Sequence, residues 1–399
     1  MANQSSSHPV LCASFNQDNS CFAIGTKDGF KIFDCDTGRL LYERVSFTRI
    51  WFILLVVGAF IIVEMLYRSS LLAIVGAGEQ PALSPRRLCL LNTTSGTPLR
   101  ELNFLTSILA VRVNRKRLIV VMLDQTYIYD VNSLEIKRII DTVPNAQGLC
   151  AFSAHMDNPY MALPASTVKG SVLIYNVMDL QSHSEVVLQT FSCGSDFDSI
   201  ICLASFSIHA HRSPLAAMTF SSNGMYIATA SEQGTIIRVH LISEATKSYS
   251  FRRGTYTSTI FSLSFGPSAD FPDILLASSS SGSVHIFSLD FDPNERKSNS
   301  FLGSIMPGAV SDALDPAHHL VFHHASAAGV RSDAVIRKIE KTSGASMSEP
   351  VALRATVSVI TFSGYYQEYG LRINQMHEAT WTLEHEFNLL TAIAEQTVN

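Results

Sequence analysis

A unit of four short apolar runs, joined by turn-forming residues, recurs along the chain. In the first copy the runs span 11–15, 21–25, 30–33 and 39–42, and the joining segments are rich in Asn, Asp and Gly. The unit returns at 215–251, for three of its runs at 260–289, and more loosely at 62–104, 107–140 and 148–179. Four strands in about 40 residues are typical of a propeller blade. We therefore expect an all-β, seven-bladed β-propeller with four-stranded antiparallel blades.

The repeat also suggests where the domain begins and ends. We expect a flexible polar leader at 1–8, the propeller at 9–390 and a tail at 391–399. Blade 5 is expected at about 209–254, blade 6 at about 255–325 and the last blade at about 320–390. No Trp-Asp dipeptide occurs, so the repeats are degenerate WD repeats.

Composition and motif searches exclude several classes of function. The net charge of −5 gives no general attraction to nucleic acid, so we expect no such partner. The seven cysteines are scattered without C-x-x-C spacing, which favours a reducing compartment and argues against zinc or a disulfide framework. No G-x-S-x-G, H-E-x-x-H or P-loop is present, so we predict neither an enzyme nor a cofactor.

Three segments depart from the repeat. The run 50–63 is continuously apolar but shorter than the roughly 20 residues that a membrane helix needs. It is interpreted as a lengthened strand region between blades 1 and 2, with a membrane anchor as the alternative. The segment 186–208 fits no blade strand cleanly. The stretch 290–316 is a long loop with an apolar centre, and long loops are usually functional or disordered.

Two interpretations of the 290–316 loop remain open. It packs back on its own blade, or it forms a short helix that presents an apolar face, which would consist of Phe301, Leu302, Ile305 and Met306. A group of four histidines follows at positions 318, 319, 323 and 324. We interpret it as a solvated loop rather than a metal site, since no cysteine or carboxylate spacing supports one.

The most distinctive polar motif is Phe251-Arg252-Arg253-Gly254, at the end of a strand-like run. Adjacent side chains on a strand point to opposite sides, so the two arginines can face two neighbouring binding sites. Each guanidinium is a planar fork suited to phosphate. Gly254 then allows the backbone to turn. Alone, such a pair also fits a solvated strand edge.

The chain resembles the PROPPIN family, seven-bladed propellers of autophagy that bind phosphoinositides. The resemblance rests on 14–18, 63–66, 107–112 and 148–151, and most strongly on 210–217, 228–239 and Phe251-Arg252-Arg253-Gly254. It covers about 9 to 390. It implies two sites for lipid headgroups on the rim of blades 5 and 6, each taking phosphatidylinositol 3-phosphate or the 3,5-bisphosphate. It also makes 290–316 a membrane-inserting loop.

The resemblance assigns residues to each site. The first site is implied to contain His211, Ser231, Thr235, Arg238 and Arg252, and the second Arg253, Ser279, Ser283 and His285. Relatives often have Thr at position 283, and we expect little loss because Ser is also a hydroxyl donor.

Two segments lack a counterpart in the family. They are 45–57, between blades 1 and 2, and 186–208, just before His211. Both begin at valine, whose codon starts with the GT that opens most introns, so retained intron sequence is a hypothesis for both.

The family further implies that the protein is cytoplasmic and peripheral on preautophagosomal and endosomal or vacuolar membranes. It implies recruitment of an autophagy lipid-transfer protein. The alternative is a propeller that is a protein-interaction scaffold without lipid binding. A further alternative, an integral membrane protein, is supported only by the apolar run 50–63. We predict that Arg252→Thr with Arg253→Thr abolishes vesicle binding and leaves the fold intact.

Overall fold

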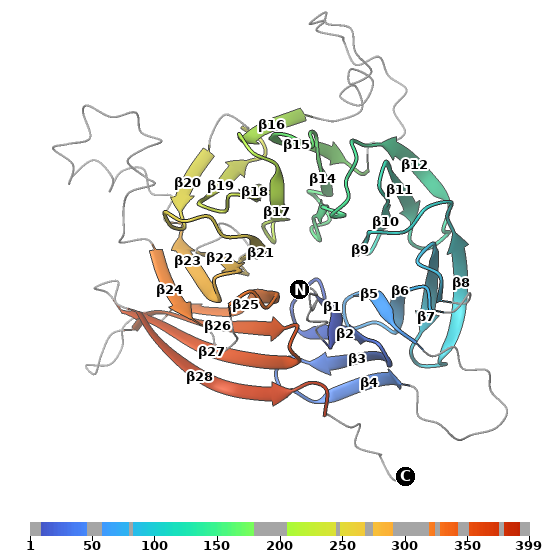
Figure 1. Cartoon of the computed structure of the whole chain (residues 1–399), viewed down its shortest axis with the longest axis horizontal. Helices are drawn as coiled ribbons and strands as arrows, with labels where there is room; N and C mark the ends of the chain where they lie inside the picture. Colours follow the sequence, from blue (N-terminus) through green and yellow to red (C-terminus); the bar gives the residue numbers. More distant parts are fainter. Residues whose placement is uncertain are drawn as a thin grey trace, which may run out of the picture.

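The structure is a computed structural model that describes residues 9–45, 58–79, 83–178, 206–244, 248–267, 274–289, 319–323, 328–341, 351–374 and 379–391. The strands form seven four-stranded sheets in which successive strands pair antiparallel. The sheets stand around a central axis, with β1, β5, β9, β17, β21 and β25 innermost (Figure 1). This arrangement confirms the predicted seven-bladed β-propeller.

The sheets are numbered 1 to 7 in chain order. Sheets 1 to 4 consist of β1 (Val10–Phe15), β2 (Cys21–Thr26), β3 (Gly29–Asp34), β4 (Leu40–Val45), β5 (Phe60–Met65), β6 (Leu71–Gly76), β7 (Arg87–Asn92), β8 (Thr97–Asn103), β9 (Ala110–Val113), β10 (Arg117–Val121), β11 (Gln125–Asp130), β12 (Ile136–Asp141), β13 (Ala151–Phe152), β14 (Tyr160–Pro164), β15 (Gly170–Asn176) and β16 (Phe206–His211). Sheets 5 to 7 consist of β17 (Leu215–Phe220), β18 (Tyr226–Ser231), β19 (Ile236–Leu241), β20 (Ser248–Arg252), β21 (Ile260–Phe265), β22 (Ile274–Ser279), β23 (Ser283–Ser288), β24 (His319–His323), β25 (Ser332–Lys341), β26 (Val351–Thr361), β27 (Tyr365–Asn374) and β28 (Ala379–Asn388).

The hydrophobic core lies between neighbouring sheets. One cluster joins sheets 4 and 5 through Ile174, Ala210 and Ile227, and another joins sheets 5 and 6 through Val239 and Phe287. A sheet that is buried on both faces needs apolar side chains on both faces. This explains why a second strand such as β2 is nearly continuously apolar. The outermost strands are the exception, since β8 is exposed along most of its length.

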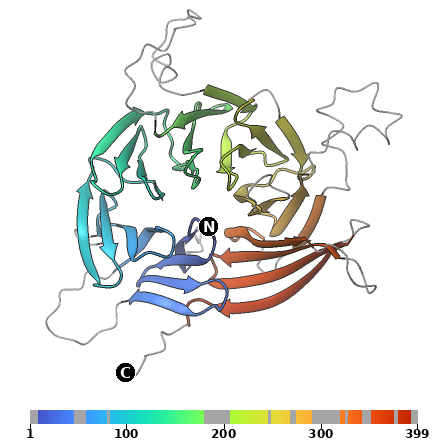
Figure 2. The same cartoon turned by 180° about the vertical axis from the view of Figure 1, so that it is seen from behind.

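Sheets 7 and 1 close the ring side by side, without exchanging a strand (Figure 2). The ring of Tyr366 on β27 stacks on Phe22 of β2, with centroids 4.9 Å apart. The backbone amide of Val10 donates to the carbonyl oxygen of Phe362 at 3.3 Å. Ring stacking and this backbone hydrogen bond therefore help to join the two ends of the propeller, together with the ion pair between Arg337 and Asp36 at 2.9 Å.

Several segments singled out in the sequence now have a partial placement. Of the apolar run 50–63, residues 60–63 lie in β5, and 50–57 lie outside the described residues. No helix in the described ranges is long and apolar enough to span a bilayer. Of the two segments without a family counterpart, Val45 ends β4 and 206–208 begin β16, so the end of the second one does fit a strand. The rest of both lies outside the described residues.

The histidine-rich stretch differs from its interpretation. Residues 319–323 form strand β24, which pairs with β23 and completes sheet 6. The prediction of a solvated loop is therefore wrong for these five residues. The spacing of histidines along the chain does not show whether a segment pairs with a distant strand. No cluster of metal-ligating side chains occurs among the described residues.

Candidate anion-binding site

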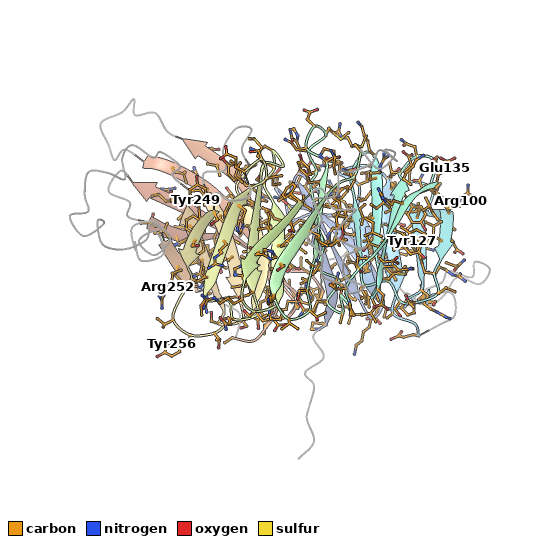
Figure 3. All side chains as sticks on the ribbon, turned by 90° about the horizontal axis from the view of Figure 1, so that it is seen from above. Arg100, Tyr127, Glu135, Tyr249, Arg252 and Tyr256 are labelled. Carbon is orange, nitrogen blue, oxygen red and sulfur yellow. The ribbon has the colours of Figure 1, made fainter. Side chains whose placement is uncertain are left out.

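Arg252 and Arg253 leave sheet 5 on opposite sides. Tyr249 and Phe251 of β20 pack on the cluster between sheets 5 and 6, so the alternation of a strand turns Arg252 away from that interface. Arg252, the last residue of β20, is exposed at the edge of the ring (Figure 3). Arg253 follows on the side of sheet 6 and is only 8% exposed.

The guanidinium of Arg253 is held by backbone carbonyls. Its Nε donates to the carbonyl oxygen of Gly234 at 2.7 Å, and its Nη2 donates to that of Tyr256. Its backbone amide donates to the carbonyl oxygen of Thr235 at 2.8 Å. Burial lowers the pKa of Arg253, although a guanidinium remains charged at neutral pH. Arg253 is thus a fixed positive charge whose Nη1 is not used in these bonds.

A tight turn between β18 and β19 supplies the carbonyls of Gly234 and Thr235, whereas that of Tyr256 comes from the loop after β20. The amide of Gly234 donates to the carbonyl oxygen of Ser231 at 2.9 Å, and Gly234 has a φ of +60°. A Cβ on Gly234 would lie 1.8 Å from the carbonyl oxygen of Ser258, so only glycine fits here. The turn buries Ser231 and leaves Thr235 half-buried directly after it.

The first group of predicted residues spans sheets 4 and 5. His211 is the last residue of β16 in sheet 4, and its Nε2 lies 3.0 Å from Oγ1 of Thr229 on β18. Arg238 of β19 donates through Nη1 to the carbonyl oxygen of Ala210. Burial, and then the positive charge of Arg238, lower the pKa of His211 to about 4. The structure therefore brings His211 and Arg238 together, with the imidazole neutral at pH 7.

The second group lies in sheet 6, next to the face on which Arg253 emerges. The Oγ atoms of Ser279 and Ser283 are 3.1 Å apart, and Oγ of Ser283 is 2.7 Å from Nε2 of His285. All three side chains are buried. They form one chain of hydroxyls that ends on an imidazole.

Part of that chain has a purely structural role. Oγ of Ser279 donates to the carbonyl oxygen of Ser283 at 3.1 Å. Thr26 in sheet 1 makes the same bond to Gly29 at 3.2 Å, and Thr361 in sheet 7 makes it to Tyr365 at 3.2 Å. A hydroxyl at the end of a second strand therefore closes the next turn in several sheets. Ser279 needs no ligand to explain its position.

Sequence reasoning missed three residues at these sites. Thr229 holds His211, and Ser281 lies 2.8 Å from Oγ of Ser279 and 2.6 Å from Oγ of Ser283. Tyr256 supplies a carbonyl to Arg253 while its own side chain is 85% exposed at the edge of the ring (Figure 3). Cross-strand pairing could have identified Thr229, because it lies opposite Arg238 in the register of β18 and β19. Phe301, Leu302, Ile305 and Met306 lie outside the described residues.

Comparisons with known proteins agree with this architecture. The family model described as PROPPIN matches residues 9–313. The chain is 62% identical over 395 residues to autophagy-related protein 18b of Arabidopsis thaliana, covering 98% of this chain and 99% of the relative. Hsv2 of Kluyveromyces lactis has a similar fold, with a TM-score of 0.67, 16% identity and coverage of 96% and 99%. KlAtg21, in its complex with the coiled coil of AgAtg16, is similar with a TM-score of 0.65, 21% identity and coverage of 94% and 98%.

Proposed function

Because the chain belongs to the PROPPIN family, we propose that it is a phosphoinositide effector of autophagy. It binds phosphatidylinositol 3-phosphate, the 3,5-bisphosphate or both through two sites on the edge of the ring. It then recruits autophagy machinery to the membranes of forming autophagosomes. The Arabidopsis relative, which matches nearly the whole chain, carries an autophagy name, and this supports the autophagy role.

The observation that carries the proposal is the arginine pair at the end of β20. Arg252 offers an exposed guanidinium on the side of sheet 4, and Arg253 offers a preplaced one on the side of sheet 6. The two sides of sheet 5 that these arginines face also carry hydroxyl–imidazole pairs, Thr229 with His211 towards sheet 4 and Ser283 of sheet 6 with His285. Phosphate monoesters bind best to bidentate guanidinium with short hydroxyl donors. The two sites would therefore accept two headgroups at once.

Two weak sites on one edge suffice to hold a protein on a membrane. When the first headgroup is bound, the second site meets other headgroups at a high effective concentration. A basic side chain close to an anionic leaflet adds about 1 kcal/mol. The apolar residues of the 290–316 loop would add burial in the interface. The propeller would then stand on its edge and leave the rest of its surface free.

The free surface is where a protein partner would bind. A similar fold, KlAtg21, occurs in a complex with a coiled coil, so a propeller of this shape can present such a surface. The partner we propose for this chain is the autophagy lipid-transfer protein that PROPPIN relatives recruit. The protein would be cytoplasmic and peripheral on preautophagosomal and endosomal or vacuolar membranes. Alkaline carbonate should then release it from membranes, whereas retention in the pellet would favour an integral protein.

Flotation with liposomes tests the lipid-binding claim. The full chain should float with vesicles of phosphatidylcholine that contain phosphatidylinositol 3-phosphate, and should not float when unphosphorylated phosphatidylinositol replaces it. The Arg252→Thr, Arg253→Thr double variant should not float with either. A folded wild-type chain that never floats would instead favour the protein-interaction scaffold.

A further inference from the structure

A second imidazole, that of His240, shares a face of β19 with Arg238 in the interface between sheets 4 and 5. His240 of β19 pairs across the sheet with Ile227. Ile227 and Ile242 both pack in the cluster that includes Ala210 of sheet 4. Because side chains two positions apart share one face of a strand, Arg238 and His240 both face sheet 4, with Cα atoms about 7 Å apart.

His240 is a poor choice for an ordinary core position. It is 4% exposed, and its Nδ1 has no hydrogen-bond partner among the described residues. Leaving a buried polar atom unpaired costs free energy that an apolar ring of the same shape would not cost. Burial, and then the charge of Arg238, lower the pKa of His240 to about 4. The ring is thus neutral and its Nδ1 unpaired beside a cation.

His211 shares this environment. The groups that shift its pKa are Arg238, the hydrogen bond with Thr229 and His240, after the dominant effect of burial. The cross-strand neighbours of His240, Ile227 and Ser248, carry no charge. After burial, the charge of Arg238 is the next largest cause that lowers the pKa of both imidazoles, so an anion that neutralises Arg238 should raise both pKa values.

We propose that the first anion site is proton-coupled and that His240, together with His211, takes up a proton from solvent when a phosphate monoester binds beside Arg238. The phosphate cancels the repulsion that Arg238 exerts on both rings and attracts protons to them. Each imidazolium then adds a positive charge behind the bound anion. This inference rests on the proposed function and assigns His240 to the site as a positioning residue that tunes its charge.

Proton uptake can be measured directly. The full chain is titrated with inositol 1,3-bisphosphate, the soluble headgroup, by calorimetry at pH 6.5 in buffers that differ in ionisation enthalpy. The wild type should take up measurably more protons per headgroup than His240→Phe. The affinity ratio of wild type to variant should rise at least threefold between pH 7.5 and pH 5.5. Comparison with the variant removes the protonation of the phosphate itself, which has a pKa near 6.

A matched variant and a second readout make the outcomes decisive. His385→Phe changes an exposed histidine on β28 of sheet 7 and should match the wild type in proton uptake. Equal uptake by His240→Phe and wild type would overturn the inference while leaving the proposed function intact, whereas no binding by the wild type at any pH would contradict the proposed function. If His240→Phe does not fold, the imidazole resonance of His240 in the wild type serves instead. It should shift towards imidazolium when headgroup is added at pH 6.5, and an unchanged resonance would also overturn the inference.

Discussion

Arg252 and Arg253 are neighbours in the chain, but the structure gives their side chains different tasks. Strand alternation was enough to predict that they point apart. It was not enough to predict that Arg253 is buried against the carbonyls of Gly234 and Tyr256, since those contacts come from a turn and a loop. Arg253 is therefore a structural residue as well as a candidate ligand, and a loss of binding on its replacement has two explanations.

This difference should appear in stability. Replacing Arg253 by Thr leaves two carbonyl oxygens without a donor, so we expect a loss of about 1–3 kcal/mol in the free energy of unfolding. Arg252→Thr removes an exposed side chain and should change it by less than about 0.5 kcal/mol. Urea unfolding followed by circular dichroism measures both. Equal stability of the two variants would contradict the buried role of Arg253.

The buried histidines predict a dependence of stability on pH. His211 and His240 have pKa values of about 4 in the folded state, below the usual 6.5. The unfolded chain therefore binds protons first, and stability falls as the pH drops from 6.5 towards 4. Between pH 6.5 and pH 5 each histidine should cost about 1–2 kcal/mol. Urea unfolding of His240→Phe should show a shallower loss than the wild type, and parallel pH profiles would contradict this.

At the scale of single elements, the turn that follows β18 sets the position of the arginine pair. Gly234 gives the turn its left-handed residue and its carbonyl bond to Arg253, while Thr235 binds the Arg253 backbone. The repeat unit expected at 215–251 includes this turn, whose residues Ser231-Glu232-Gln233-Gly234 are turn formers that act through adjacent positions. It could not predict the contact between Gly234 and Ser258, which depends on how sheets 5 and 6 pack.

A pair of glycine variants separates backbone strain from that packing. Gly96 lies between β7 and β8 with a φ of +67°, and a Cβ added there would have no atom within 4 Å, so Gly96→Ala should cost about 1–2 kcal/mol from strain alone. Gly234→Ala adds a clash with the Ser258 carbonyl and should cost at least about 2 kcal/mol more. It should also weaken vesicle binding, whereas Gly96→Ala should not. Similar costs in urea unfolding would show that the close approach at Gly234 is relieved easily.

The positions of strands along the chain were more predictable than the strands and side chains that lie against them in the fold. Expected runs such as 11–15 and 21–25 match β1 and β2 to within one residue, because alternation and turn residues are local signals. The strand β24 was missed because its pairing with β23 joins residues far apart in the chain. His240 was overlooked as part of the site for the same reason: its importance lies in what sheet 4 places against it.

At the scale of the whole molecule, one buried cation takes part in closing the ring. Arg337 of β25 lies 2.9 Å from Asp36 of sheet 1 and 3.1 Å from Glu368 of β27, and its side chain is 5% exposed. Tyr366 links the same region to sheet 1 through a bond from its hydroxyl to the Cys35 carbonyl at 3.1 Å. The repeat predicted seven blades but not how the last one meets the first, since that contact spans almost the whole chain.

Removing that cation should open the closure. Arg337→Met leaves the buried Glu368 with its hydrogen bond from Tyr366 but without a cation, so we expect a loss of about 3–5 kcal/mol in the free energy of unfolding. Lys338 contacts the same Asp36 at 2.7 Å but is 56% exposed, so Lys338→Met should cost less than about 1 kcal/mol. Thermal and urea unfolding would measure both. Comparable losses would mean that burial of Arg337 adds nothing to closure.

Phosphoinositide membranes should bind at the edge of the ring that carries the arginine pair. Arg252 and Arg100 are both exposed arginines, at well-separated positions on the ring (Figure 3). Flotation with vesicles that contain phosphatidylinositol 3-phosphate should therefore compare Arg252→Thr with Arg100→Thr, which change the net charge equally. We predict that Arg252→Thr weakens binding at least fivefold, in line with about 1 kcal/mol or more per basic contact, while Arg100→Thr binds like the wild type. Equal binding by the two variants would contradict the assignment of this edge to the membrane.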